Sequence, residues 1–359
     1  MKKIIFLLSI VIFGCKEKTK ESFSVIEVHV TNQHSLDSLI IYDKEKSWEV
    51  KTTLRFNKSN SIKDTLNILE KKIYQIYSFS DGKQGELGEL LISPNSTIVL
   101  SVDENELFES ITYDGSFKEP NNFLAYSKKH QNQLSNTVRN GIEQKELELL
   151  IHEKGDLINE KGISLNIVDS LSTYVKVNFN KFSNILKQKN AKYLYKRSLV
   201  NEIGNNFSFK DITNNDISLK DFHGKYLYID VWATWCKPCK VEYDFLKQLE
   251  EHFSNNDELQ IISISTDRDF DKWEKYITKN SIEGIQLYSG ENSEFVKFYD
   301  VGALPRFILL DKEGRVISPE ELRPSNPKLL KKLESTVITI ASTNCLFSPT
   351  SENFYGFSC

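Results

Sequence analysis

The sequence of 359 residues has few cysteines, little excess charge and, after its N-terminus, no long apolar run. Five cysteines are too few for a disulfide scaffold, and a chain of this length can bury a core without one. A net charge of −4 excludes nucleic-acid binding through bulk positive charge. At about 100–200 residues per domain, the length predicts two or three domains. Because the cysteines are few, each one can be considered for a function of its own.

The N-terminus carries the features of an export signal. Two lysines precede the apolar run Ile4–Phe13, which is too short to cross a bilayer as a mature helix. The segment that ends at Gly14-Cys15 resembles a bacterial lipobox. This resemblance implies that residues 1–14 are a lipoprotein signal peptide and that Cys15 carries the lipid. The alternative is a plain signal peptide with an incidental cysteine. With a lipid anchor, the mature protein would lie outside the cytoplasm, tethered to a membrane.

The first half of the chain changes from a strand pattern to a helix pattern. Residues 24–110 contain short alternating strands separated by Asn, Asp, Gly and Ser, which predicts a β-sandwich-like domain. Residues 119–200 form a predicted helical segment, in which Tyr174, Phe182 and Leu186 lie on one apolar stripe. We expect that stripe to pack against a neighbouring domain.

The second half alternates strands with helices. Over residues 204–340 this order predicts an α/β domain, with a mostly parallel sheet that has an antiparallel edge. Residues 341–359 show no period and are interpreted as an irregular tail. The predicted fold is therefore an α/β domain at the C-terminal side, preceded by a β-sandwich-like domain and helices.

Cys236 and Cys239 form a CxxC pair between a buried strand and a helix. A helix N-terminus stabilises negative charge, and the thiolate is the nucleophile in disulfide exchange, so this placement favours reactivity. Pro238 fits the first helical turn, and the cation of Lys237 further favours a thiolate. The sequence therefore predicts a redox-active disulfide, with Cys236 exposed at the helix terminus.

Two other interpretations of a CxxC pair are a zinc site and a structural disulfide. A zinc site needs a second pair of ligands, and the six histidines show no close pairing along the sequence. A structural disulfide would not need the helix terminus or Pro238. We expect no metal and no cofactor apart from the disulfide of Cys236 and Cys239.

The segment around this pair resembles the TlpA/ResA-like thiol-disulfide oxidoreductases of the thioredoxin superfamily. The resemblance rests on the lead-in 218–225, the strand with its CxxC pair over 228–242, and Gly302–Pro305 before the strand 306–311. It implies a thioredoxin-like fold in which Pro305 follows a cis peptide bond and faces the CxxC pair. It also implies that the substrate docks at residues near the pair and this proline: Trp235, Lys237, Pro238, Leu304 and Pro305.

Two acids match positions of this family. Asp230 lies six residues before Cys236, and Glu242 lies three residues after Cys239. Burial raises the pKa of an acid and suits it to accept the proton of Cys239. For Glu242 the alternative is an exposed helix residue. Arg306 replaces the threonine that is common in the family after the proline, and we expect it to alter substrate docking.

The remaining features bear on localisation and on partners. Cys345 and Cys359 either pair as a structural disulfide or stay free in the tail. The N-terminal β region resembles an uncharacterised sandwich domain found ahead of TlpA-like domains in Bacteroidetes lipoproteins. The sequence therefore predicts a membrane-tethered extracytoplasmic thiol-disulfide oxidoreductase, which reduces or exchanges disulfides of cell-envelope proteins and has an electron donor or acceptor in the membrane. The alternative is a non-enzymatic lipoprotein whose sandwich domain binds a ligand and whose thioredoxin-like domain is a scaffold.

Overall fold

The computed structural model describes residues 22–32, 35–46, 48–56 and 59–338, and the chain divides into two compact units at residues 188 and 189. The predicted signal peptide, its Cys15, and the tail with Cys345 and Cys359 lie outside the described residues. Within the described ranges, no helix has the length and apolar character needed to cross a membrane. Each unit is described separately below.

The first unit begins with two four-stranded sheets. One sheet has the order β4 (Ser61–Asn67), β1 (Phe23–Thr31), β7 (Thr97–Asp103), β8 (Thr112–Gly115). The other has the order β3 (Glu49–Arg55), β2 (Leu36–Asp43), β5 (Lys72–Ser80), β6 (Lys83–Ile92). Short 3-10 turns follow β2 and β7, at η1 (Lys44–Lys46) and η2 (Glu104–Glu106).

Alternating apolar side chains from both sheets form the core of this β-rich region. In β1 every second residue is buried, and Val28 joins one hydrophobic cluster with Leu100 of β7 and with Leu39 and Ile76 of the other sheet. Period-two alternation is what a sheet needs when only one of its faces is buried. The region is therefore β-rich, as the sequence predicts.

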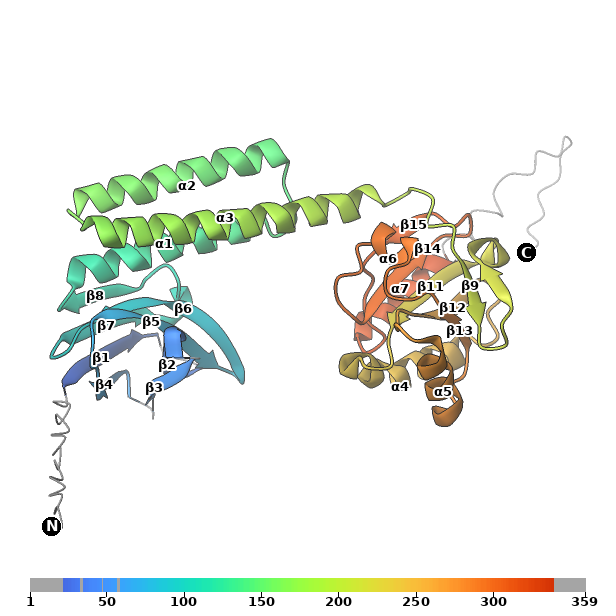
Figure 1. Ribbon diagram of the computed structural model, residues 1–359, viewed down its shortest axis with the longest axis horizontal. Coiled ribbons are helices and arrows are strands. Elements are labelled where there is room, and N and C mark those ends of the chain that lie inside the picture. Colours follow the sequence, from blue (N-terminus) through green and yellow to red (C-terminus); the bar gives the residue numbers. More distant parts are fainter. Residues whose placement is uncertain (1–21, 33–34, 47, 57–58, 339–359) are drawn as a thin grey trace, which may run out of the picture. The chain divides into compact units, whose positions relative to one another are not determined.

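The first unit also contains α1 (Lys118–Thr137), α2 (Gln144–Ser164) and the part of α3 (Asp169–Ser198) up to Gln188. Phe123 of α1 and Phe179 of α3 pack on Leu91 of β6, with Phe182 from the predicted apolar stripe beside them. Helix α2 comes close to α1 at Gly162, where an added Cβ would lie 3.0 Å from the ring of Phe123. The apolar stripe of α3 thus packs within this unit. Figure 1 shows α1, α2 and α3 beside one another.

The second unit is built on one seven-stranded sheet. Its order is β10 (Asp216–Ser218), β9 (Ser208–Asp211), β13 (Ile285–Tyr288), β12 (Leu259–Ser265), β11 (Tyr226–Trp232), β14 (Arg306–Leu310), β15 (Val316–Ser318). Only the pairs β11–β12 and β12–β13 are parallel. The prediction of a mostly parallel sheet with one antiparallel edge is wrong, because antiparallel strands flank the parallel centre on both sides.

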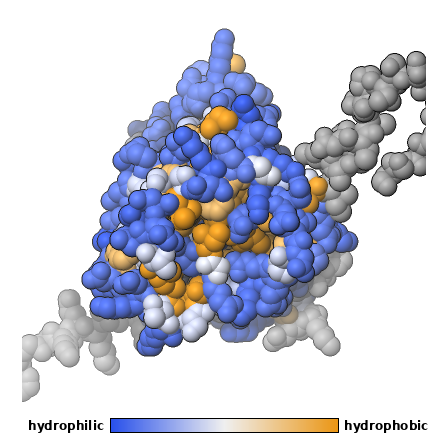
Figure 2. All heavy atoms as spheres, turned by 90° about the vertical axis from the view of Figure 1, so that its right-hand side faces the viewer, coloured by the Kyte–Doolittle hydropathy of each residue, from blue (hydrophilic) through white to orange (hydrophobic). Residues whose placement is uncertain are grey.

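Helices cover both faces of this sheet. The helical elements are η3 (Leu219–Phe222), α4 (Lys237–His252), α5 (Phe270–Asn280), α6 (Glu294–Phe298) and α7 (Pro327–Ile338). Leu246 of α4 and Leu333 of α7 pack with Tyr228 on one face of β11, whereas Phe295 of α6 packs with Ile229 on the other. Strand β11 is therefore central and apolar on both faces, as in α/β sheets. On the side of this unit seen in Figure 2, apolar patches interrupt a mainly hydrophilic surface.

Candidate active site

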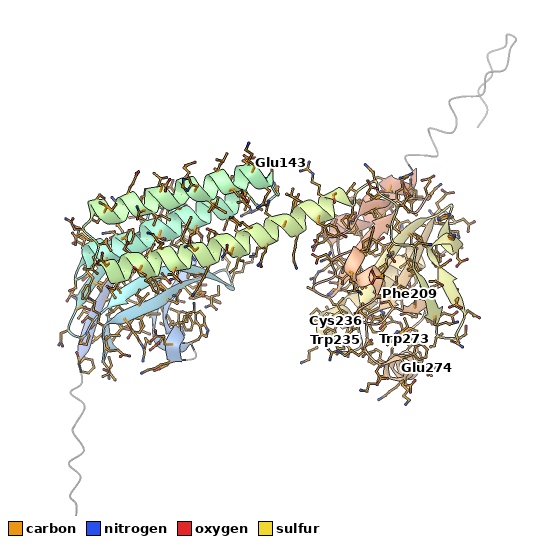
Figure 3. All side chains as sticks on the ribbon, turned by 45° about the horizontal axis from the view of Figure 1, so that its top comes forward. Glu143, Phe209, Trp235, Cys236, Trp273 and Glu274 are labelled. Carbon is orange, nitrogen blue, oxygen red and sulfur yellow. A yellow bond between two sulfur atoms is a disulfide. The ribbon has the colours of Figure 1, made fainter. Side chains whose placement is uncertain are left out.

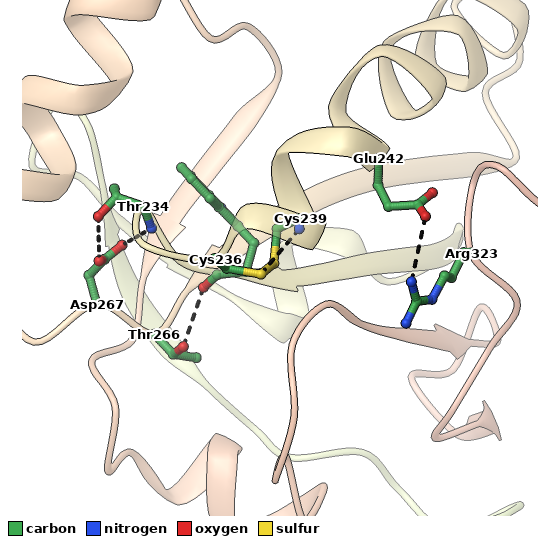
Figure 4. Close-up of a disulfide and its surroundings, with 8 residues drawn as sticks. Thr234, Cys236, Cys239, Glu242, Thr266, Asp267 and Arg323 are labelled. Carbon is green, nitrogen blue, oxygen red and sulfur yellow. Dashed lines mark hydrogen bonds and ion pairs between the residues drawn. A yellow bond between two sulfur atoms is a disulfide. The ribbon is translucent and has the colours of Figure 1, made fainter. Parts of the chain in front are cut away.

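The CxxC pair is located where β11 passes into α4. Cys236 is the N-cap residue of α4, and its Sγ accepts a hydrogen bond of 3.1 Å from the backbone N–H of Cys239. The two cysteines form a disulfide, with their Cα atoms 5.3 Å apart (Figure 4). Pro238 lies in the first turn, where its missing N–H leaves no carbonyl unpaired. The helix N-terminus therefore points its free N–H groups at Cys236, as the sequence predicts.

Both cysteines are buried. Cys236 is 3% exposed and Cys239 is 7% exposed, so the prediction of an exposed Cys236 is wrong for the disulfide form. The reason is that both belong to a hydrophobic cluster with Trp232 and Trp273 of α5. Trp235, in contrast, is 66% exposed beside Cys236 (Figure 3), and its indole is available to a docking protein. Lys237 and Pro238, two other residues of the predicted docking set, are also exposed.

The proline loop lies next to this cluster. The Leu304–Pro305 peptide bond is cis, which confirms the prediction. In the pairing of β14 with β11, Arg306 lies opposite Val231, so the proline loop meets the end of β11 that leads to the cysteines. Leu304 packs directly against the cluster that contains Cys236 and Cys239. Leu304, which is half-buried, therefore lies beside the disulfide, and Pro305 after it is buried.

Arg306 does not face a docking site. Its side chain is 6% exposed, donates a hydrogen bond of 3.4 Å to the backbone oxygen of Pro319, and lies 3.5 Å from Glu320. The side chain of Arg306 therefore presents almost no surface to a substrate, and its effect on docking stays a prediction. The buried guanidinium instead connects β14 to the segment after β15.

Asp230 lies in the middle of β11 and points to the same side of the sheet as Trp232. Its Oδ2 accepts a hydrogen bond of 3.4 Å from Ser263 of β12, the residue opposite it in the parallel pair. The pKa of Asp230 is raised to about 8, chiefly because burial disfavours the charged form. The carboxylates of Glu250 and Glu242 act in the same direction, and the hydrogen bond from Ser263 opposes them.

A cavity of about 240 Å³ connects this acid to the disulfide. Asp230, Trp232 and Cys239 contribute to its wall, together with Lys240 and Tyr276. The ammonium of Lys240 lies 4.8 Å from the centre of the Tyr276 ring. Because the cavity touches both Cys239 and the raised-pKa acid, it provides a space for proton transfer between them.

Glu242 is buried on another side of α4. It is 6% exposed, and its carboxylate accepts hydrogen bonds of 3.0 and 2.9 Å from the backbone N–H and the hydroxyl of Ser325. Arg323 lies 3.9 Å from the same carboxylate (Figure 4). The alternative of an exposed helix residue is therefore wrong. Glu242 does not line the cavity, and its partners lie on the segment before α7.

One buried acid near the site has no counterpart in the sequence prediction. Asp267, 4% exposed, follows β12 and binds Thr234 of the loop between β11 and Cys236. The sequence does contain a signal for it. Because β11 and β12 are parallel, the polar residues after both strands meet at one edge of the sheet, where sites of α/β proteins form.

The arrangement joins a helix-terminal disulfide, an exposed aromatic residue, a cis-proline loop and a raised-pKa acid. Among the described residues, no group of three or more His, Cys, Asp or Glu side chains could hold a metal ion. The Cys236–Cys239 disulfide is a group that can exchange with thiols.

Comparison with known proteins agrees with this chemistry. A family described as thioredoxin-like matches residues 224–316. The thiol-disulfide oxidoreductase ResA of Bacillus thuringiensis subsp. konkukian is 30% identical over 131 residues, which are 36% of this chain and 75% of that protein. The chain belongs to the ResA-like thiol-disulfide oxidoreductases. It is therefore an oxidoreductase that exchanges disulfides, and its thioredoxin-like domain lies at the C-terminal side.

Further similar proteins carry related names. ResA of Bacillus subtilis is 25% identical over 112 residues, 31% of this chain and 62% of that protein. A solution structure of a putative thiol-disulfide oxidoreductase from Bacteroides vulgatus has 40% sequence identity and a TM-score of 0.35, and covers 41% of this chain and 94% of that one.

Proposed function

We propose that this ResA-like oxidoreductase works outside the cytoplasm, tethered to a membrane by lipid on Cys15, and reduces or exchanges disulfides of cell-envelope proteins. The support for the location is the N-terminal sequence, with its two lysines, its short apolar run and its lipobox-like end. A thiol or disulfide protein in the membrane supplies or accepts the electrons. No metal or further cofactor takes part.

Cys236 is the attacking residue in this proposal. Its thiolate attacks one sulfur of a substrate disulfide, so a mixed disulfide forms and one substrate thiolate leaves. Cys239 then attacks the Sγ of Cys236, which closes the Cys236–Cys239 disulfide and releases the second substrate thiolate. Two electrons pass from the cysteine pair to the substrate. The observation that carries this order is the position of Cys236 at the N-cap of α4, where helix N–H groups stabilise its thiolate.

Asp230 is the proton acceptor for Cys239 in this proposal. It shares the cavity with Cys239, and a pKa of about 8 lets it hold or release a proton near neutral pH. Glu242 is instead occupied by Ser325 and Arg323, so its role is to hold α4 to the segment before α7. Trp235, Lys237, Pro238, Leu304 and Pro305 form the docking surface around the disulfide.

Two experiments test the proposal. Reduction of a protein disulfide by the dithiol form should proceed with wild-type protein and stop with Cys236→Ser, and an inactive wild type would overturn the enzymatic part. For the anchor, expression in bacteria fed a radiolabelled fatty acid should label the wild type and not Cys15→Ala. Equal labelling of both, or of neither, would overturn the anchor and leave the enzymatic part standing.

A further inference from the structure

The loop between β11 and α4 is tied down from the end of β12. The polar residues Ser265, Thr266 and Asp267 close that strand, and they are 0%, 6% and 4% exposed. Thr266 donates from its N–H and from its hydroxyl to the backbone oxygen of Trp232, at 2.9 and 3.3 Å. The start of the loop is thus held by one backbone and one side-chain hydrogen bond from Thr266.

The side-chain carboxyl group of Asp267 binds Thr234, the next residue but one after Trp232 in the loop. Its Oδ2 accepts a hydrogen bond of 2.9 Å from the backbone N–H of Thr234, and its Oδ1 accepts one of 2.7 Å from the hydroxyl of Thr234 (Figure 4). Ser265 donates a third, of 2.8 Å, to Oδ2. Hydrogen bonds to an ionised acceptor are about twice as strong as neutral ones, and a buried carboxylate that loses its donors is costly.

The held loop leads directly to the nucleophile. One residue separates Thr234 from Cys236, and the N–H of Cys236 donates to the backbone oxygen of Ala233 at 3.0 Å. The Sγ of Cys236 faces the N–H of Cys239 only while Cys236 keeps its N-cap conformation. A loop that moved would take Cys236 out of that position, and the exposed Trp235 would move with it.

We propose that Asp267 is a positioning residue for the nucleophile: by binding Thr234 it fixes the loop that sets Cys236 at the N-cap of α4 and Trp235 on the docking surface. The assignment of Cys236 as the nucleophile rests on the proposed function. The contact between Asp267 and Thr234 adds how Cys236 is held in position. The contact between Asp267 and Thr234 matters in the reduced enzyme, because Cys236 is then a free thiolate and must stay at the helix terminus that stabilises it.

The test uses Thr234→Val, which removes one hydrogen bond at nearly constant volume and without a change of charge. The reduced full-length protein is alkylated over a range of pH, and the modification of Cys236 is followed by mass spectrometry. We expect alkylation at neutral pH to slow about tenfold, because the pKa of the less stabilised thiol rises. The reduction potential of the cysteine pair should become more negative, because the reduced form loses stabilisation.

Two control variants separate positioning from stability. Thr234→Ser keeps the hydroxyl and should restore the wild-type alkylation profile. Thr213→Val removes a similar contact to Asp211 from an exposed turn and should leave the profile unchanged. In an Asp267→Ala background, Thr234→Val should have no further effect.

An unchanged alkylation profile and potential in Thr234→Val would overturn the proposal, whether or not its melting temperature falls, and so would a failure of Thr234→Ser to restore the profile. If Asp267→Ala does not fold, the single variants of Thr234 still test whether the contact positions Cys236. Neither readout needs a protein substrate, so failure of the proposed function, seen as an inactive wild type, remains distinguishable.

Discussion

Replacement of Asp230 by asparagine tests the acid beneath the disulfide. The pKa of this carboxyl is about 8 in the folded protein, against 3.8 for an ordinary aspartate. Between these values the folded state holds a proton that the unfolded state has released. Stability therefore falls as pH rises through this window, by about 1.4 kcal/mol per pH unit, and changes no further above about pH 8.

The size of the loss in stability follows from the pH range over which only the folded state holds the proton. From about pH 5 to pH 8 the loss amounts to about 4 kcal/mol. This is a ceiling, because Asp230 borders a cavity that water can enter. Asp230→Asn has no charge to bury, so its stability should lack this fall and exceed that of the wild type at about pH 9. Urea unfolding of the oxidised proteins at several pH values measures the difference, with Asp244→Asn, an exposed acid of α4, as the matched control.

The same variant tests catalysis. If Asp230 accepts the proton of Cys239, closure of the mixed disulfide should slow by about 10²- to 10³-fold near neutral pH in Asp230→Asn, a usual range for general base catalysis. Stopped-flow tryptophan fluorescence follows that step. Parallel loss of stability in wild type and variant between pH 5 and 9 would refute the raised pKa, and an unchanged closure rate would refute the catalytic role.

Further predictions concern other buried or exposed groups. Glu242→Ala should lower the free energy of unfolding by about 1–3 kcal/mol, because the two hydrogen bonds that join α4 to Ser325 are lost, with little effect on the closure rate. A closure rate lowered 100-fold at unchanged stability would contradict this. Trp235→Ala should change stability by less than about 0.5 kcal/mol but raise KM for a protein substrate in an enzyme assay, and an unchanged KM would remove it from the docking surface. Asp43→Ala should cost about 1–3 kcal/mol in urea unfolding, because Lys72, 2.6 Å from Asp43 and mostly buried, would keep only its contacts with the exposed Glu70 and Glu45. A cost below about 0.5 kcal/mol would show that these two acids replace Asp43.

Local sequence patterns predicted the features that depend on neighbours along the chain. The CxxC pair, Pro238 and the apolar strand before them lie within 14 residues, 226–239, and this was enough to predict Cys236 at a helix terminus. The prediction for Pro305 came from family resemblance, and the cis bond agrees with it. These features can be predicted without knowing which distant segments of the chain come together.

What the sequence could not predict depends on pairing between distant segments. The sheet has antiparallel strands on both sides of its parallel centre because β9 pairs with β13 on one side and β14 pairs with β11 on the other. The paired strands are about 75–80 residues apart in the chain, and the periodicity of the sequence does not indicate which distant strands pair. The partner of Glu242 is Ser325, 83 residues away. Asp267 reaches Thr234 over 33 residues. Burial of Cys236 likewise results from residues of α5 that only the fold brings near.

The most direct test of the account is the covalent intermediate. Reduced Cys239→Ser protein, incubated with an excess of an oxidised protein substrate, should accumulate a mixed disulfide that mass spectrometry after proteolysis places on Cys236. Cys236→Ser under the same conditions should accumulate far less, because Cys239 lacks the N-cap position at which helix N–H groups stabilise a thiolate. An adduct that forms on Cys239 in preference, or no adduct with either variant, would contradict the assignment of Cys236 as the attacking residue.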